Sequence, residues 1–581
     1  MGKVMVIVLG IVFIFLLIIY VDGRMPVATN GQSPALLGFV PNEILVKFKP
    51  DAPESLVRQK LESVLANIVS YLGKELAVNE WTRSDEINRS FLGDPDLFHL
   101  RVPASYGEER ALSSLSSDPW IEYAEKNAVG QVFTVPEDTY FNLLWGLHHI
   151  EGQGGTPDAD IDAPEAWDIH TGSTEVVVAI TDSGIDYTHV DLDANIWTNP
   201  AESGAFKNDG IDNDNNGYED DWIGWDFKTG NPSPGNEDND PMDEHDTPQK
   251  PEWYHGTHVA GIVGAEGNND SGVVGVCWDV KLMALKITSI DGLYDLTSAL
   301  HAIDYAIANG AHIINASWGQ TSFSPSLLAA IERARAEGII FVAAAGNDYH
   351  NDNDIYPRYP ASYDLDNIIS VLSTDNNDQL SGFSNCGLYS VDLGAPGGSG
   401  PSQTPPNIFS TKRGDVYQYH GGTSFAAPYV SGVAALLWGQ RPELSWWENK
   451  TIILKSVNNL SSLIGKARSQ GRLNAFNSLT WPTPVLPNAP TDLNGQAYPG
   501  ESGYDIELDW IDNSDNESGF IVFRRSGNVY WEIGRTAANV TSYWDRELPA
   551  GYWYYYVRAY RQDGESTKTP NIAIKAFGSS H

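Results

Sequence analysis

The chain of 581 residues contains only two cysteines, Cys277 and Cys386, which excludes a disulfide-built scaffold. Its stability must come from buried apolar cores, to which bound ions can add, and we expect the two cysteines to be unpaired. Positive charge is also scarce: 36 lysines and arginines stand against 76 aspartates and glutamates, a formal net charge of −40. This balance disfavours nucleic acid and anionic membrane as partners.

The amino terminus has the order of a secretory signal. Lys3 precedes an uncharged apolar run from Val4 to Val21, and small residues allow cleavage after Gly23. We therefore expect a signal peptide at residues 1–23 and a secreted, extracellular protein. The run just reaches membrane-spanning length, so an uncleaved anchor remains the alternative.

The remaining chain is too long for one core and predicts several domains. Residues 38–133 indicate a small α+β domain, with a strand at 42–48, a helix in "PESLVRQKLESVLANI" and a second strand at 97–102. From 136 to 481, short apolar runs alternate with helical stretches. This alternation predicts an α/β domain with a parallel sheet covered by helices on both faces.

Polar residues end several of the apolar runs, where active residues of such sheets collect. Asp182 ends one strand, His255 begins a small-residue helix, and Ser424 lies in a glycine turn that leads into another helix. Acyl transfer to water needs a nucleophile, a base and a carboxylate that orients the base. Asn347 ends a further strand, where its amide could donate to an oxyanion. The four residues predict a hydrolytic site.

The stretch "HGTH" also contains His258, and histidines three residues apart could form half of a metal site. Zinc is disfavoured because the glutamate of H-E-x-x-H is absent. His255 stands at the helix entrance beside Gly256, where its ring can reach a cleft. We expect His258, one turn further in, to be packed and hydrogen-bonded.

Five motifs carry a family resemblance: "TDSGIDYTHVDL", "HGTHVAG", "NASWG", "AAAGN" and "GTSFAAPYVSG". Through them the chain resembles the subtilisin-like serine proteases (subtilases, peptidase family S8) over about residues 38–481. The resemblance implies that Asp182 is the carboxylate, His255 the base, Ser424 the nucleophile and Asn347 the oxyanion donor. It also implies a substrate-binding edge formed by Ser317, Trp318, Gly319 and Gly346.

Acidic residues are concentrated at 208–246. The run "DNDNNGYEDD" places side-chain oxygens at alternating positions and then a glycine, which is the pattern of a calcium loop. It departs from an EF-hand because position twelve is Ile223, so Asp221 would have to close the loop. The alternative is a solvated acidic surface. The expected ligands are Asp212, Asp214, Asn216, Asp221 and the carbonyl of Tyr218.

The resemblance implies a second calcium site, so we expect one or two Ca²⁺ ions. The stretch "GNNDSGVVGV" (267–276) is similar to the family's calcium loop after the catalytic histidine, but it carries one more residue than the commonest form. The implied ligands are Asp138, Asp191, Asn269 and the carbonyls of Gly267, Ser271 and Val273.

The flanking segments then acquire roles. Residues 38–133 are similar to the family's ferredoxin-like inhibitory prodomain, with "IEYAEKNAV" as the tail that lies in the cleft, and cleavage is expected between about Val129 and Asp138. A proline-rich linker follows the catalytic segment at 482–489. Short alternating aromatic strands at 490–577 resemble a fibronectin type III β-sandwich with Trp510 in its core, for which we expect an accessory role.

We thus expect a secreted, calcium-stabilised serine endopeptidase that is made as a self-processing zymogen and acts as a monomer on protein or peptide substrates. Its own prodomain is the expected intramolecular inhibitor. Two alternatives remain open: a processing or tripeptidyl peptidase on the same fold, and an exported binding protein whose protease domain is inactive.

Overall fold

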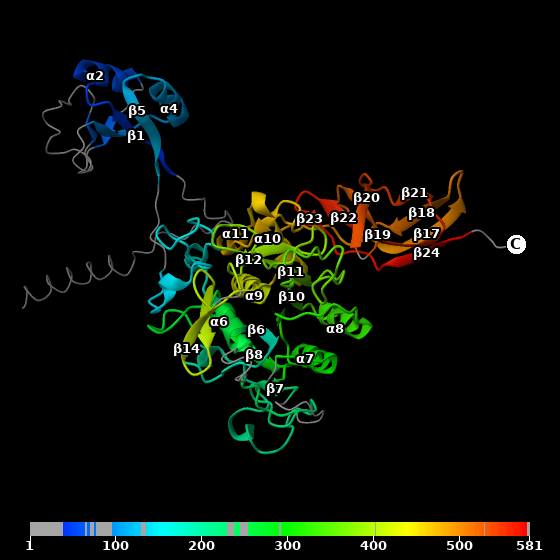
Figure 1. Cartoon of the computed structure of the whole chain (residues 1–581). Helices are drawn as coiled ribbons and strands as arrows, with labels where there is room; N and C mark the ends of the chain where they lie inside the picture. The colour runs from blue at the N-terminus through cyan, green and yellow to red at the C-terminus, as the bar shows by residue number, and fades with distance from the viewer. Residues whose placement is uncertain are drawn as a thin grey trace, which may run out of the picture. The chain divides into compact units, whose positions relative to one another are not determined.

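The computed structural model describes residues 39–63, 67–69, 75–76, 96–128, 135–228, 237–244, 254–289, 292–400, 403–527 and 529–577. The chain divides into two compact units, Met1–Val132 and Phe133–His581 (Figure 1). The predicted signal peptide and most of the predicted maturation region lie outside the described residues. Within the described ranges, no helix has the length and apolar character needed to cross a membrane.

The described residues of the first unit form one antiparallel sheet, in the order β3-β2-β4-β1-β5, and two helices. Alternate residues of its longest strand, Ile44, Val46 and Phe48, are buried against Leu61 and Leu115 of the helices. The period of two places one face of the strand on the core. The elements are β1 (Phe39–Phe48), α2 (Glu54–Ser63), β2 (Asn67–Val69), β3 (Glu75–Leu76), β4 (Leu97–Arg101), α4 (Glu108–Ser116) and β5 (Ile121–Ala128).

The second unit is built on a nine-stranded sheet in the order β15-β16-β12-β11-β10-β9-β6-β8-β7, in which every pairing except β15 with β16 is parallel. The strands are β6 (Gly172–Asp182), β7 (Gly224–Asp226), β8 (Asp279–Lys286), β9 (Ile313–Ala316), β10 (Ile340–Ala344), β11 (Ile368–Thr374), β12 (Leu393–Pro396), β15 (Asn458–Asn459) and β16 (Gly471–Arg472). A hairpin, β13 (Ile408–Lys412) with β14 (Val416–His420), lies outside this sheet.

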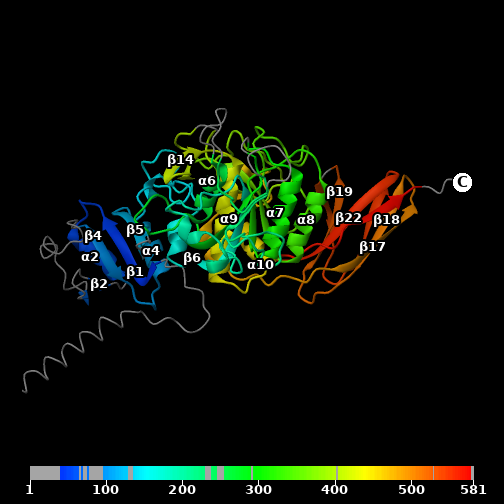
Figure 2. The ribbon, with the colours of Figure 1, turned by 90° about the horizontal axis from the view of Figure 1, so that it is seen from below.

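Helices cover both faces of the sheet, which confirms the predicted α/β class. Val178 and Ile180 of β6 face a core shared with α6 and α9, whereas Ala179 faces a second core shared with α7 and α8. Figure 2 shows the ribbons of these four helices. The α-helices are α5 (Ala163–Trp167), α6 (His255–Gly264), α7 (Leu296–Ala308), α8 (Pro325–Ala336), α9 (Thr423–Gln440), α10 (Trp446–Lys455) and α11 (Ala475–Thr480). Short 3₁₀ turns occur at η3 (Phe141–Leu143), η4 (Asp193–Asn195), η5 (Gly204–Phe206) and η6 (Ser461–Leu463).

Local sequence determines where several of these helices begin. The side chains of Asp295 and Ser324 accept hydrogen bonds from the third backbone N–H of α7 and α8. Ser445 and Glu448 form a reciprocal capping box at the start of α10. Each cap satisfies N–H groups that the first helical turn cannot satisfy itself.

Residues 491–577 form two antiparallel sheets around a common core, and we call this region the C-terminal β module. One sheet has the order β17-β18-β21, and the other has the order β20-β19-β22-β23 with β24 paired to β22. Leu508, Trp510, Phe520, Tyr555 and Val557 are buried between them. The strands are β17 (Thr491–Pro499), β18 (Tyr504–Ile511), β19 (Gly519–Ser526), β20 (Val529–Arg535), β21 (Ser542–Leu548), β22 (Gly551–Arg561), β23 (Gly564–Glu565) and β24 (Ile572–Ala576).

Cys277 and Cys386 are both buried and unbonded, as expected from the sequence. They belong to different hydrophobic clusters. Burial raises the pKa of both thiols, which keeps them in the unreactive protonated form at neutral pH.

Candidate active site

Asp182 and His255 meet at the carboxyl edge of the parallel sheet. Asp182 is the last residue of β6 and His255 the first of α6, and both side chains are buried. The Nδ1 of His255 lies 2.8 Å from the Oδ1 of Asp182. Because an ionised carboxylate only accepts hydrogen bonds, Nδ1 carries the proton in this pair, and Nε2 is the basic nitrogen of the neutral ring.

The backbone around these residues explains why glycine follows His255. A Cβ on Gly256 would lie 2.1 Å from the carbonyl oxygen of Gly184, so a larger residue would push α6 away from the end of β6. The Gly256 N–H donates to Ser183 Oγ at 2.8 Å. The backbone of the "DSG" motif therefore packs directly against that of the "HG" motif.

Ser424 lies in the first turn of α9. Its Oγ donates to the carbonyl oxygen of Ser317 at 3.1 Å, and Ser317 Oγ donates in return to the Ser424 carbonyl oxygen at 2.7 Å. The ring of the next residue, Phe425, packs on the His255 ring with centroids 5.1 Å apart. These contacts bring the start of α9 against the start of α6.

Asn347 follows β10 and faces the same turn. Its Oδ1 accepts hydrogen bonds from the backbone N–H of Thr423 at 2.9 Å and from Thr423 Oγ1 at 3.0 Å. With the oxygen engaged in this way, the amide nitrogen is the end of the side chain directed away from Thr423. Asn347 is exposed, so a substrate oxygen can approach that nitrogen near the amino terminus of α9.

The predicted substrate-binding residues lie on neighbouring segments. Ser317 contacts Ser424, and the Trp318 Nε1 donates to Thr181 Oγ1 at 3.0 Å, next to Asp182. Gly319 continues into Gln320, which pairs with Tyr359. Gly346 has φ 112°, and a Cβ there would lie 2.5 Å from Asn385 Nδ2, so the position requires glycine.

Two supporting residues of this region were missed from the sequence. Asn315 Nδ2 donates to Ser317 Oγ at 3.0 Å, and the Cγ of Arg358 lies 3.3 Å from the position of a Cβ on Gly346. Asn315 belongs to the quoted motif "NASWG" and could have been found there. Arg358 follows no local pattern, because only folding brings it beneath Gly346.

His258 has a different environment from His255. It is completely buried, and its Nε2 donates to the carbonyl oxygen of Gln418 at 3.1 Å. Its ring contacts those of His420 and Phe425. Burial, with the positive charge that neighbouring His420 can carry, holds the pKa of His258 well below its ordinary value.

The subtilase family matches residues 173–476, a little more than half of the chain, and this range contains Asp182, His255, Asn347 and Ser424. The chain belongs to the subtilase family. It is accordingly a serine endopeptidase of the subtilisin type.

The chain is also similar to individual proteins. A thermophilic serine proteinase of Bacillus sp. (strain AK1) is 33% identical over 374 residues, which cover 64% of this chain and 76% of that protein. Subtilisin-like protease 1 of Plasmodium falciparum (isolate 3D7) is 35% identical over 303 residues, which cover 49% of this chain and 40% of the parasite protein. A solved protease of Pseudoalteromonas arctica PAMC 21717 shares 28% identity with a TM-score of 0.48, covering 60% of this chain and 99% of its own.

The acidic loop of this subtilase gathers carboxylates from separate parts of the segment. Carboxylate oxygens of Glu202, Asp212 and Asp214 lie within 4.8 Å of one another. Glu202 is fully buried and was missed from the sequence because it lies ten residues before the calcium-loop pattern. The donor set of hard, charged oxygens suits Ca²⁺.

The other predicted ligands of this loop surround the same carboxylates. Asp221 is fully buried and accepts a hydrogen bond from the hydroxyl of Tyr305 at 2.6 Å; burial raises its pKa. The Asn216 amide nitrogen donates to Asp214 and Asp221, while its oxygen accepts from the Tyr218 N–H. The Tyr218 ring packs against that of Tyr305. Bound Ca²⁺ would take oxygens, so the Asn216 amide would have to turn.

The second predicted site contains carboxylate oxygens without partners. Asp138 and Asp191 are buried, and the Oδ1 atom of each has no hydrogen-bond partner among the described residues. Their other oxygens accept from the N–H groups of Asn268 and Val273. Burial, together with the charge of Asp191, raises the pKa of Asp138 to about 6. Buried, unpaired carboxylates fit a site whose cation would satisfy them.

The remaining predicted ligands of the second site lie in the adjoining loop. Asn269 Oδ1 accepts from the Ser271 N–H at 2.8 Å, so the loop is closed by its own side chain. The carbonyls of Gly267, Ser271 and Val273 belong to the same turn.

A further acidic group, Asp158, Asp160 and Asp162, has carboxylate oxygens within 4.8 Å of one another. Buried Arg472 donates to the Asp158 carbonyl oxygen at 2.9 Å and pairs with Asp378. Burial raises the pKa of Asp160 to about 8 and also raises the pKa of Asp162, and the charge of Arg472 only partly opposes this effect. Arg472 already provides a positive charge beside this group.

Proposed function

We propose that this subtilase is a secreted endopeptidase that cleaves protein substrates through Asp182, His255 and Ser424. The observation that carries the proposal is the hydrogen bond between His255 Nδ1 and Asp182 Oδ1, at a helix entrance packed against the turn that bears Ser424. Nε2 of His255 takes the proton of Ser424 as Oγ attacks the scissile carbonyl carbon, and Asp182 stabilises the imidazolium that results.

The oxyanion of the tetrahedral intermediate accepts hydrogen bonds from the Asn347 amide and a backbone N–H of the first turn of α9. Collapse of the intermediate breaks the C–N bond, and His255 returns its proton to the leaving amine. Water then hydrolyses the acyl-enzyme by the same exchange of protons. Ser317, Trp318, Gly319 and Gly346 would position the substrate chain beside Ser424.

The direct test is cleavage by the matured protein. Incubation with casein and a peptide library should give cuts at internal bonds that a serine-directed sulfonyl fluoride abolishes. Release of tripeptides alone would instead indicate a tripeptidyl peptidase, and absence of inhibitor-sensitive cleavage would indicate an inactive binding protein. Ser424→Ala should remove activity with no change in the thermal midpoint of the folded chain.

We further propose that the first unit is an inhibitory prodomain and that the protein is made as a zymogen. The support is its α+β architecture ahead of the protease and the extended strand β5 that ends it. Ser424→Ala should then accumulate as the uncut precursor after export. An Asp304→Asn control, altered at an exposed helix position, should mature normally. A precursor of the Ser424→Ala variant cut at the wild-type position would assign maturation to another protease.

Calcium is proposed at both acidic sites. When bound, the ion neutralises carboxylates that otherwise repel one another and stabilises the folded state by mass action. Glu202, Asp212, Asp214 and Asp221 would hold it in the first site, and Asp138 with Asp191 in the second.

Chelator should therefore lower the thermal midpoint of sulfonyl-fluoride-inhibited protein, and calcium without zinc should restore it. Asp212→Ala combined with Asp214→Ala should lower the calcium content by one ion per chain in metal analysis. Glu219→Ala, at an exposed position of the same loop, is the control. An unchanged ion count in the double variant would leave this loop a solvated acidic surface.

Three further properties complete the proposal. The chain is exported under its amino-terminal signal, with an uncleaved anchor as the alternative, and amino-terminal sequencing of the exported protein distinguishes them. The C-terminal β module is of fibronectin type III kind, supported by its two antiparallel sheets and the buried Trp510. A single species of monomer mass in analytical ultracentrifugation is expected.

A further inference from the structure

The C-terminal β module buries residues on both faces of one of its sheets. Along β22, Tyr555 and Val557 point into the module's own core, as the period of two requires. The intervening Tyr556 and Arg558 point to the outer face, yet they are only 4% and 2% exposed. Antiparallel sheets usually leave an outer face to water. This outer face is instead covered by the catalytic part of the second unit.

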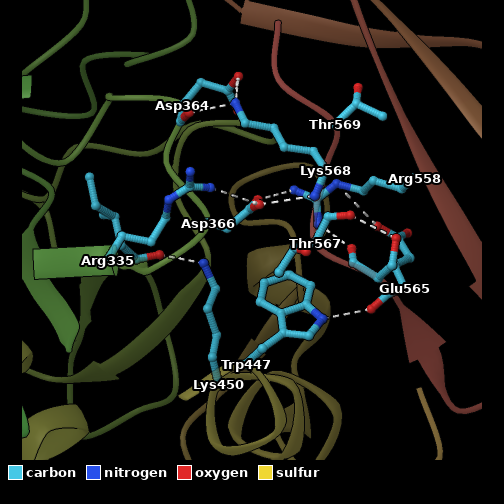
Figure 3. Close-up of polar contacts among 12 residues, drawn as sticks. Arg335, Asp364, Asp366, Trp447, Lys450, Arg558, Glu565, Thr567, Lys568 and Thr569 are labelled. Carbon is cyan, nitrogen blue, oxygen red and sulfur yellow. Dashed lines mark hydrogen bonds and ion pairs between the residues drawn. The ribbon is translucent and has the colours of Figure 1, made fainter. Parts of the chain in front are cut away.

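The centre of the covered face is an ion pair between Arg558 and Asp366. Nη2 of Arg558 donates to Asp366 Oδ1, and the two side chains are 3% and 1% exposed (Figure 3). The second oxygen of Asp366 accepts from the Lys568 backbone N–H at 3.0 Å. Burial alone would raise the pKa of Asp366, but the charges of Arg558 and Lys568 hold it at about 2. Asp366 is thus a buried anion whose nearest counter-charge comes from the module, and Arg335 of α8 lies further away, with Nη1 3.8 Å from Oδ2.

The stretch Gly564–Thr569, which we call the docking segment, supplies the surrounding contacts. Nζ of Lys568 donates to the Asp364 carbonyl oxygen at 2.6 Å and forms an ion pair with its carboxylate. The carbonyl oxygen of Glu565 accepts from Trp447 Nε1 of α10 at 2.7 Å. Figure 3 shows these contacts: Arg558 is directed at Asp366 and Lys568 at Asp364. Glu565 lies beside Trp447.

The residues that the module contacts, Asp364 and Asp366, belong to a segment that also contacts the neighbours of Gly319 and Asn347. We call Arg358–Asp366 the substrate-side segment. Its Tyr359 exchanges two backbone hydrogen bonds with Gln320, at 2.7 and 2.8 Å, directly after Gly319. Nε of Arg358 donates to Asp348 Oδ2 at 2.7 Å, one residue after Asn347. The docking contacts at 364 and 366 therefore hold one end of a segment whose other end touches the site.

We propose that the C-terminal β module is an intramolecular brace, which binds Asp364 and Asp366 through Arg558 and Lys568 and thereby holds the substrate-side segment in place. Separation of the module from the catalytic part would expose Tyr556 and break the ion pair between Arg558 and Asp366. Removal of one partner of a buried ion pair is strongly destabilising. The module is therefore docked in the working protein, in contrast to a substrate-recruiting arm on a free linker.

The test is hydrogen–deuterium exchange of the full chain carrying Ser424→Ala, so that self-digestion cannot contribute. Arg558→Met should speed exchange by at least about tenfold in peptides that cover 358–368 and 318–322, because the loss of a buried partner lowers the free energy of local opening. Arg558→Lys, which keeps the charge, should have a smaller effect. The control is Arg333→Met, which breaks an exposed ion pair with Asp304 between α7 and α8.

A double variant sharpens the result. Asp366→Asn with Arg558→Met removes both charges, so its exchange should be slower than the two single effects predict together. If Arg558→Met is not recovered as folded protein, Lys568→Met tests the same brace, because its partner Asp364 is 36% exposed. Faster exchange confined to the module, or no difference from Arg333→Met, would overturn the proposal. Hydrogen exchange of the Ser424→Ala chain does not depend on catalysis, so this test is independent of the test of the proposed function.

Discussion

His255 and His258 lie one turn apart on the same helix, and both rings contact Phe425, yet their surroundings differ. His255 has a carboxylate at Nδ1, whereas His258 has only a carbonyl oxygen at Nε2. A carboxylate stabilises the imidazolium that a base must become, and a buried carbonyl does so far less. The comparison shows that a histidine's role here is set by its partner and its desolvation, since both rings come from one motif.

The largest expected effect is on turnover. His255→Ala should lower kcat/KM for a small peptide by at least about 10⁴-fold, because the proposed base is lost. It should also block self-maturation. Steady-state kinetics on protein matured in trans measures the effect, with His301→Ala at a half-exposed helix position as the control. Activity retained by His255→Ala and lost by folded His258→Ala would reverse the assignment.

The stability of the folded protein at acid pH should depend on the buried histidines, His258 and His420. Burial lowers the pKa of His420 to about 4 and that of His258 in the same direction. The unfolded chain therefore binds protons below about pH 6.5 that the folded chain does not bind, so these groups make stability fall as pH decreases from about 6.5 toward 4. His420 alone contributes up to about 3 kcal/mol of this loss.

Urea unfolding of inhibited protein at saturating calcium, measured at pH 7, 5.5 and 4, follows this loss. His420→Phe keeps an aromatic ring beside Phe425 and should flatten the pH dependence. His301→Phe should leave it unchanged. Equal slopes in all three proteins would show that the acid sensitivity comes from carboxylates elsewhere.

Replacement of His258 should affect stability more than chemistry. His258→Phe leaves the buried carbonyl oxygen of Gln418 without its donor, which costs about 1 to 3 kcal/mol. The folded fraction should keep kcat within a few-fold of the wild type. Active-site titration before kinetics separates the two quantities, and a fall in kcat per titrated site as large as that of His255→Ala would contradict a packing role.

The smallest effect concerns the ring that both histidines share. Phe425 stands directly after Ser424, and phenylalanine, unlike methionine, has no sulfur to oxidise. Its ring is 4% exposed and lies among His255, His258 and His420. Phe425→Met should lose active sites faster under peroxide than the wild type, as counted with a serine reagent. Equal rates of inactivation would mean that position 425 does not control oxidative sensitivity.

Much of the catalytic region could be predicted because its residues end regular elements. Asp182 closes an apolar strand and Ser424 opens a helix, so parallel pairing alone puts them at one edge of the sheet. The fourth carboxylate of the acidic loop, Glu202, could not be predicted, since no local spacing links it to Asp212. The docking role of the C-terminal β module was equally hidden, because its strands show the same alternation whether the outer face is wet or covered.

The sequence by itself determined the α/β class, the chain order of Asp182, His255 and Ser424, and the glycine beside His255, because strand period, helix caps and backbone sterics act over a few residues. Only the tertiary structure decided which histidine meets a carboxylate, which acidic oxygens are left without partners, and that Arg558 neutralises Asp366 from 192 residues away. Desolvation and charge pairing depend on which surfaces come together, and that information exists only once the chain is folded.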